Sequence, residues 1–235
     1  MNHLKAAVNL LVADTQTRDN EVYLIFIKMS IDVMINKKSL WWRGLKMSDA
    51  LITKRAIATG LKELVDEKPF NKISIRDITE KCGLNRQTFY YHFQDKYELV
   101  NWIYYQEGFA PLMEGVTFEN WYLKVEDLLV LMKKEQSFYY STISCDERGM
   151  TEYLFNITAT LFKEAIEKLD ESHTVQPEDE TFISHFFAHG VCGTIISWVK
   201  SGMREDPKLV AMNLKYIAIN CEKLAYHRYM SAASD

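Results

Sequence analysis

Residues 74–99, with the sequence SIRDITEKCGLNRQTFYYHFQDKYEL, most constrain what this chain can fold into. Their pattern predicts two short helices joined by a tight turn. Ser74 is a suitable cap for the first helix, with Asp77 at the position where a capping box usually has Glu or Gln. Gly83 supplies a left-handed turn position at little steric cost, and Asn85 is a suitable cap for the second helix. The stretch therefore predicts a helix-turn-helix.

The second helix of this motif carries residue types that contact DNA. Phe89 and Phe93 lie four residues apart and share its buried side, which leaves polar and aromatic side chains near the surface. Arg and Gln pair bidentately with base edges, whereas Thr, Tyr and His reach phosphates. Lys96 falls in the first turn of the next helix, where a bound phosphate would offset the unfavourable position of a cation. The predicted DNA contacts are Arg76, Asn85, Arg86, Gln87, Thr88, Tyr90, Tyr91, His92 and Lys96.

An ordinary helical corner with all its aromatic residues in the core is the alternative interpretation. The match along the whole stretch favours DNA binding, because the chain resembles the TetR (tetracycline repressor-like) family of bacterial regulators. This resemblance implies a three-helix DNA-binding domain over residues 48–104, whose first helix runs from Asp49 to about Glu67. The run NRQTFYYHFQDKYELVNWIY also resembles a subgroup named after regulators of the dihydroxyacetone kinase operon. The family resemblance rests on Ile75, Ile78, Gly83, Leu84, Thr88, Phe89, Tyr90, Phe93, Lys96 and Leu99.

The charge of the chain is unevenly distributed. Its formal net charge is −4, which alone argues against nucleic-acid binding. Residues 48–104, however, hold 9 basic and 8 acidic side chains, whereas residues 105–235 hold 12 basic and 20 acidic ones. Because the acidic excess lies outside the predicted DNA-binding domain, it does not oppose phosphate contact there.

Residues 1–46 have no counterpart in the family pattern. They form either an N-terminal arm or an artefact of the gene model, and we expect an artefact or a disordered extension with Met47 as the start. The apolar run at 22–35 is too short, and too interrupted by Lys28 and Asp32, to span a bilayer. The four scattered cysteines predict a reduced chain without disulfides. We therefore expect a cytoplasmic protein that does not associate with a membrane.

After residue 104 the periodicity of apolar residues predicts only helices. The connecting helix is expected to end at Gly108 and Pro111. Further helices should begin after Thr117, after Gly149 and at Thr181, and a final one should run from Pro207 to about Tyr226. The fold class is therefore all-α with about nine helices. It combines a helix-turn-helix domain with a helical regulatory and dimerisation domain at residues 105–235.

Aromatic residues and histidines of the second domain are candidates for a ligand pocket, which the family resemblance implies. Core packing is the simpler explanation for any one of them. The spacing of His185, His189 and Cys192 would also suit a metal, but we expect a ligand contact or core histidines, and no metal site or cofactor. The predicted pocket residues are Phe138, Tyr139, Phe155, Phe162, His185, Phe186 and His189.

The sequence contains no phosphate-binding glycine loop, nucleophile elbow or suggestive carboxylate pair, so we expect no enzyme activity. The last two helices resemble the family's dimerisation pair, with Ala188, Gly190, Gly193 and Ser197 as small contact residues and Ile217 among the apolar ones. Expected partners are a double-stranded DNA operator and a second copy of the chain. The family default is a repressor released by a small-molecule effector. The subgroup resemblance instead implies an activator with a protein co-regulator, and a protein-interaction module with a vestigial DNA-binding part is a third alternative.

Overall fold

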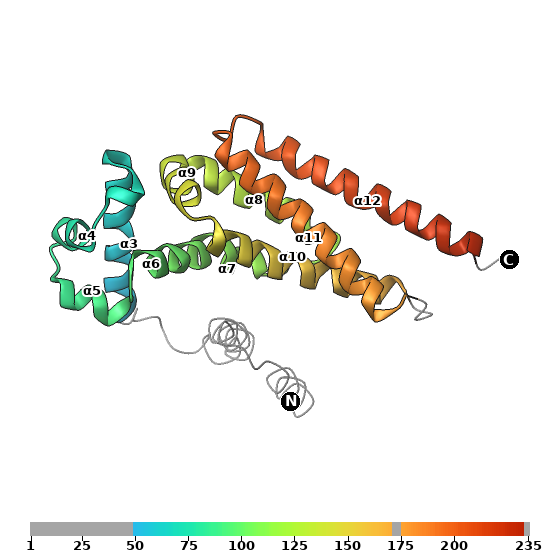
Figure 1. The fold of residues 1–235 in the computed structure, drawn as a ribbon, viewed down its shortest axis with the longest axis horizontal. Helices are drawn as coiled ribbons and strands as arrows, with labels where there is room; N and C mark the ends of the chain where they lie inside the picture. Colours follow the sequence, from blue (N-terminus) through green and yellow to red (C-terminus); the bar gives the residue numbers. More distant parts are fainter. Residues whose placement is uncertain (1–48, 171–174, 233–235) are drawn as a thin grey trace, which may run out of the picture. The chain divides into compact units, whose positions relative to one another are not determined.

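The computed structural model describes residues 49–170 and 175–232 (Figure 1). The predicted extension at residues 1–46 lies outside them. The elements in chain order are α3 (Asp49–Glu67), the 3-10 helix η2 (Phe70–Lys72), α4 (Ile75–Lys81), α5 (Arg86–His92), α6 (Lys96–Ile103), η3 (Tyr104–Phe109), α7 (Ala110–Met113), α8 (Trp121–Lys134), α9 (Gln136–Cys145), α10 (Arg148–Leu169), α11 (Pro177–Lys200) and α12 (Pro207–Ala232).

The predicted all-α class is confirmed, since no strand occurs in the described residues. If α6, η3 and α7 are counted as the one helix they form, the described chain holds nine α-helices. We call α3 to α5 the head, the stretch from α6 to α7 the connecting segment, and α8 to α12 the body. In Figure 1 the connecting segment leads from the head into the body.

The connecting segment continues past the point where the sequence predicts its end. Its middle turn, η3, is a π-helix, in which the Ala110 N–H donates to the carbonyl of Tyr105. Gly108 does not end the helix. Its missing side chain instead makes room for α8, since a Cβ there would lie 3.3 Å from Cδ1 of Leu128. Pro111 does not end the helix either and falls in the first turn of α7, directly after the π-turn.

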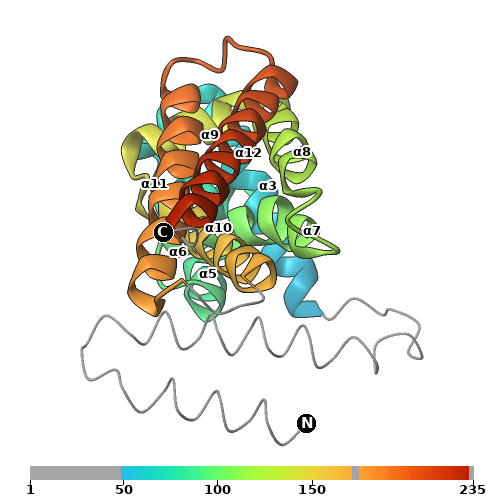
Figure 2. The same ribbon diagram turned by 90° about the vertical axis from the view of Figure 1, so that its right-hand side faces the viewer.

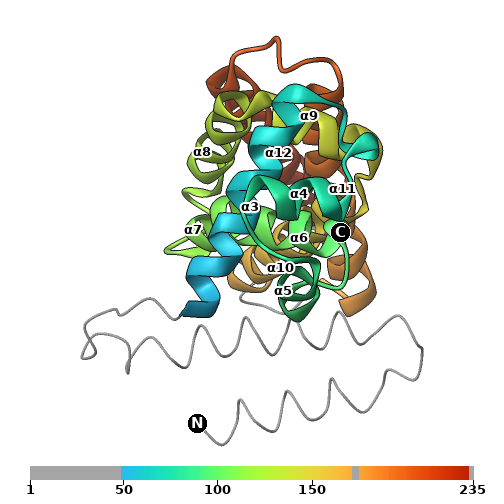
Figure 3. The ribbon, with the colours of Figure 1, turned by 90° about the vertical axis from the view of Figure 1, so that its left-hand side faces the viewer.

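The head is built around one short row of buried side chains. Apolar residues of α3 spaced by a helical repeat meet Ile78 of α4 and Phe89 of α5, both fully buried. The α3 residues in this core are Ile57, Ala58, Leu61, Leu64 and Val65. Figure 3 shows α3, α4 and α5 together on the side that faces the viewer. Burial of these faces supports α4 and α5, which are too short to be stable alone.

The body consists of long helices packed in pairs. Helix α10 packs along α11, and α12 packs against α8 (Figure 2). By length and composition alone α11 could cross a membrane, but Val191, Ile195 and Val199 bury one of its sides in the core. Phe162 and Phe187 stack with ring centroids 4.6 Å apart where α10 meets α11. Aromatic packing thus joins the body helices.

Candidate nucleic-acid interface

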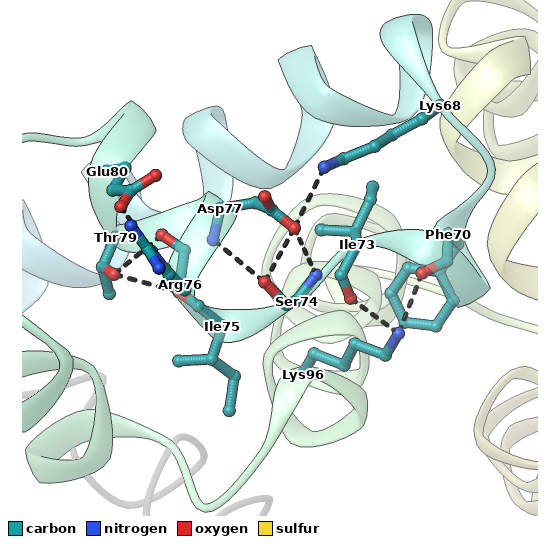
Figure 4. A network of polar contacts seen from close by, with 10 residues as sticks. All are labelled: Lys68, Phe70, Ile73, Ser74, Ile75, Arg76, Asp77, Thr79, Glu80 and Lys96. Atoms are coloured by element: carbon teal, nitrogen blue, oxygen red, sulfur yellow. Dashed lines mark hydrogen bonds and ion pairs between the residues drawn. The ribbon is translucent and has the colours of Figure 1, made fainter.

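The turn between α4 and α5 has the geometry that the sequence predicts. Ser74 and Asp77 form the full capping box: the Asp77 N–H donates to Oγ of Ser74, and the Ser74 N–H donates to the Asp77 carboxylate at 2.7 Å (Figure 4). Gly83 adopts a left-handed φ of 67°. The Leu84 N–H then reaches back to the carbonyl of Thr79 at 2.9 Å. These local bonds fix the direction in which α5 leaves the turn.

Asn85 begins α5 and is occupied by that task. Its Oδ1 accepts a hydrogen bond from the Thr88 N–H at 2.7 Å and another from the Thr88 hydroxyl at 3.0 Å. A side-chain cap of this kind stabilises the first turn of a short helix. Of the predicted DNA contacts, Asn85 and Thr88 therefore bond to each other in the free protein, with Thr88 half-buried.

The two sides of α5 differ sharply in character. Phe89 and Phe93 are buried, with ring centroids 5.8 Å apart. Four of the predicted contacts on α5 are exposed to solvent: Arg86, Gln87, Tyr90 and Tyr91. Tyr91 is 84% exposed, which is unusual for a tyrosine that serves no contact. We call Arg86, Gln87, Tyr90 and Tyr91 the α5 surface.

His92 closes the α5 surface at the C-terminal end of the helix. Its ring lies edge-on to Tyr91, with centroids 5.0 Å apart. Burial, and then the nearby ammonium of Lys54, lower the pKa of His92, so it is a neutral hydrogen-bonding group near pH 7. Lys54 itself lies over the rings of Phe93 and Trp102, at 5.1 and 5.9 Å. This cation at the edge of α5 was missed from the sequence, because no local pattern links α3 to the end of α5.

Two other predicted contacts are cations that already have partners within the head. Arg76 is exposed, and its Nε pairs with Oε1 of Glu80 at 2.7 Å, which raises its pKa (Figure 4). Lys96 is half-buried, and its Nζ donates to the carbonyls of Phe70 and Ile73, each at 2.9 Å. Burial lowers the pKa of Lys96. An ammonium has three donors, so one N–H of Lys96 remains for a phosphate.

The predicted ligand pocket is not gathered into one site. Phe138 and Tyr139 are buried in the core, where Tyr139 stacks on Tyr104 with centroids 5.6 Å apart. Phe162 packs against Phe187, whereas Phe186 on α11 is 63% exposed. The predicted residues thus lie in the core, at a helix contact and on the surface.

Phe155, His185 and His189 form a second group, apart from the buried pair Phe138 and Tyr139. The Phe155 ring meets His185 and His189 at centroid distances of 5.0 and 4.8 Å. Cys192 is buried and directs its Sγ to the carbonyl of Thr151, so it does not join the two exposed histidines. In the described residues no group of three possible ligands is placed to hold a metal.

The body has two hollows of different size and openness. An apolar cavity of about 40 Å³ lies between α8, α10 and α11, with Trp121, Leu128 and Leu161 in its walls and none of the predicted pocket residues. An open hollow of about 360 Å³ lies on the surface, with Arg148, Phe155 and His189 among the residues that line it. The cavity has room for little more than one water molecule, whereas pockets for small molecules usually measure about 300–1,000 Å³.

Helices α11 and α12 expose apolar side chains that nothing in the described chain covers. The residues are Phe182, Phe186, Leu209, Met212, Tyr216 and Ile217. Gly190, Gly193 and Ser197 are exposed as predicted, and a Cβ at either glycine would meet nothing within 4 Å. Ala188, by contrast, is fully buried against the rest of the chain and is not available for a contact between copies.

Two stretches of the chain match models of known protein families. Residues 57–103 match a family model described as bacterial regulatory proteins, tetR family. Residues 119–220 match one described as a transcriptional regulator C-terminal region, whose name also places it in that family. Together the two matches span most of the described chain, from α3 to α12.

The chain is also similar to individual regulators. It is 29% identical over 151 residues to the HTH-type dhaKLM operon transcriptional activator DhaS of Lactococcus lactis subsp. lactis (strain IL1403), covering 63% of this chain and 80% of the relative. The solved structure of a dihydroxyacetone kinase operon activator DhaS has a TM-score of 0.58 and 20% identity, over 74% of this chain and 98% of that one. A crystal structure of NalD, the secondary repressor of the MexAB-OprM multidrug efflux pump in Pseudomonas aeruginosa, has a TM-score of 0.49 and 19% identity, over 73% of this chain and 97% of that one.

Proposed function

The chain is a transcriptional regulator of the TetR family, and from that premise we propose that it binds a two-part operator as a homodimer, with α5 of each copy in a major groove. The α5 surface carries this proposal. Arg86 and Gln87 lie at the start of α5, and both are exposed to solvent. In a helix-turn-helix, residues at this end of the second helix contact base edges.

The other predicted contacts divide into two groups by their partners in the free protein. In this proposal Tyr90, Tyr91 and His92 bind phosphates, and Lys54 adds a cation at the edge of the α5 surface. Arg76 would have to exchange Glu80 for a base, and Lys96 can offer a phosphate only the N–H that the carbonyls leave unused. Asn85 and Thr88 act first as the cap of α5, so their share in DNA contact is indirect.

The exposed apolar residues of α11 and α12 support the homodimer. Large apolar side chains that remain exposed on two long helices support a surface that another molecule covers. An isologous dimer is the simplest cover, because it presents two α5 helices to two half-sites of a palindrome. The exposed Gly190 and Gly193 allow close helix approach, and Ile217 and Tyr216 supply apolar area.

For the sign of regulation we favour an activator that works with a protein partner. The 40 Å³ cavity in the body is too small for an effector molecule, and the relative from Lactococcus lactis is described as an operon activator. The second candidate is the ligand-responsive repressor that the sequence favours. One observation supports it: the open hollow beside Phe155 and His189, which is large enough to hold a small molecule.

Selection of bound sequences from random DNA tests the proposal as a whole. We expect an inverted repeat, and Arg86→Ala should cost about 1–3 kcal/mol and relax specificity at one position of each half-site. If Arg86→Ala weakens binding to selected and to random DNA by the same factor, Arg86 does not recognise a base. Deleting the gene then separates the two signs of regulation: transcription from the selected promoter should fall for an activator and rise for a repressor.

A cytoplasmic protein without catalytic activity or a cofactor fits this function. A vestigial head on a protein-interaction module is the alternative of another class. It predicts that no sequence is enriched in the selection and that deletion changes no transcript, so the same two experiments exclude or support it.

A further inference from the structure

Lys62 joins the head to two other parts of the chain. It extends from α3, and its Nζ pairs with Oε2 of Glu107 in the connecting segment and with Oε2 of Glu135, 2.9 Å away, where α8 meets α9. The Lys62 side chain is only 18% exposed, and its ammonium lies 5.4 Å from the ring centroid of Phe138. Because these ion pairs are partly shielded from water, they resist screening better than pairs on an open surface.

A second bridge between head and body runs through Phe70. The Phe70 N–H donates to Oγ of Ser141 on α9 at 3.0 Å, while its carbonyl accepts from Lys96 at the start of α6. The Phe70 side chain is buried, and its ring meets Tyr97 edge-on at 5.4 Å (Figure 4 shows Phe70 and Lys96). One residue between α3 and α4 therefore contacts both the body and the connecting segment.

These contacts make α9 a second support for the head. Helix α9 packs against both α3 and η2, and it is tied to the connecting segment by a buried hydrogen bond of 2.7 Å from the Tyr104 hydroxyl to Thr142. A head held by the connecting helix alone could rotate about the axis of that helix. Lys62 and Ser141 hold it at points away from that axis and so resist the rotation.

We infer that Lys62 and Ser141 are positioning residues that fix the orientation of the head, so that the dimer accepts one separation of the two half-sites. The inference rests on the proposed function, since it assumes two heads on one operator. Neither residue lies on the α5 surface. Their loss should therefore change the geometry that the protein accepts and leave the bases that it recognises unchanged.

The test measures how steeply affinity depends on half-site spacing. The full-length double variant Lys62→Met/Ser141→Ala is compared with the wild type on the selected operator and on duplexes with one base pair added or removed at its centre. One base pair moves a half-site by about 3.4 Å along the helix and also rotates it. The preference for the selected spacing should fall at least about fivefold in the variant, because each looser head reaches other spacings more easily. Affinity for a single half-site should stay the same.

Two control variants separate positioning from loss of stability. Lys81→Met removes a lysine that pairs with Glu67 at 2.8 Å and Glu63 at 3.4 Å, both on α3, so it breaks the same kind of contact inside the head. It should leave the spacing preference unchanged. The single variant Lys62→Arg, with Ser141 unchanged, keeps the cation and should retain most of the wild-type preference for the selected spacing.

The outcomes distinguish this inference from the proposed function. A folded double variant with the wild-type spacing preference would overturn the inference alone. If the double variant does not fold, Ser141→Ala and Lys62→Met are tested singly, and wild-type preference in both would overturn it equally. A wild type that selects no operator would remove the proposed function and this inference with it.

Discussion

The head and the body are stabilised by different kinds of interaction. In the head and at the start of the connecting segment, α4, α5 and α6 are each capped by a side chain at the preceding residue: Ser74, Asn85 and Asp95. In the body, Asp206 caps α12 in the same way, but α8 to α11 begin without such a cap and are held by aromatic and aliphatic packing between distant segments. Short helices need local bonds because they bury little surface, whereas long ones gain enough from packing.

The comparison extends to the surfaces that the two regions expose. The α5 surface combines a cation and an amide with two tyrosines. The helix that carries them is fixed by hydrogen bonds between residues close in the sequence. The body exposes apolar residues on helices whose other sides are buried. The head is thus suited to charged, hydrogen-bonding DNA, and the body to another apolar surface.

The largest effect should come from placing a charge on the apolar side of α12. Ile217→Asp should convert the dimer to a monomer and weaken operator binding by about 100-fold or more, because two linked half-site contacts become one. Analytical ultracentrifugation and fluorescence anisotropy measure the two effects. Val130→Asp on α8 is the matched control, since Val130 is 52% exposed and Ile217 is 55% exposed. A dimeric Ile217→Asp variant with full affinity would place the interface elsewhere.

The head is easier to predict from the sequence than the body, because its helices are fixed by local bonds and the body helices by packing between distant segments. The first helix was expected at Asp49 to about Glu67 and is observed there, and the caps of α4 and α5 are the predicted residues. Those signals act over three or four positions, so they are visible in the sequence.

The contacts that the sequence did not predict join residues far apart in the chain. Lys96 meets the carbonyls of Phe70 and Ile73 across the whole of α4 and α5. In the body, periodicity marks Phe138 and Phe162 as apolar but does not say which helix each one packs against. The predicted pocket is dispersed for that reason, and the π-turn of η3 likewise has no local signature in its residues.

Gly60→Ala tests how closely α3 and α4 pack in the head. An Ala at this position would place its Cβ 2.4 Å from Sγ of Cys82, whose thiol donates to the carbonyl of Ala56. Gly to Ala in a helix normally stabilises by about 1 kcal/mol. Here we expect a loss of about 1–3 kcal/mol from overpacking. Urea unfolding should show the opposite sign in a Cys82→Ala background, where the space is free. Stabilisation by Gly60→Ala alone would contradict the close packing.

Lys96→Met separates structural from DNA-contacting cations. It removes two hydrogen bonds from an ammonium to backbone carbonyls, and we expect it to lower the free energy of unfolding by about 1–2 kcal/mol. Arg86→Ala on the exposed α5 surface should leave that free energy within about 0.5 kcal/mol of the wild type. Thermal unfolding without DNA measures both. Equal stability of the two variants would mean that the Lys96 bonds contribute nothing net, and that its role is phosphate contact alone.

The smallest effect concerns the acid in the capping box of α4. The Ser74 N–H, then the Ser74 hydroxyl and the Lys68 ammonium, hold the pKa of Asp77 well below its ordinary value of about 3.9. A carboxyl with a lowered folded-state pKa adds stability above its unfolded pKa, and that stability is lost as the pH falls through the folded value. Because Asp77 is close to solvent, Asp77→Asn should lower the melting temperature at pH 7 by no more than about 2 °C.

The pH dependence identifies the charge on Asp77 as the cause. The difference in melting temperature between wild type and Asp77→Asn should be constant from pH 7 to about 5 and shrink below about pH 4, where the carboxylate of the unfolded wild type begins to protonate. Lys68→Met removes the ion pair at 3.0 Å and leaves both Ser74 bonds, so it should reproduce only a small part of the shift. A difference that persists unchanged at pH 2 would assign the effect to side-chain shape, because the contribution of a lowered pKa must shrink once the carboxyl of the unfolded chain is protonated.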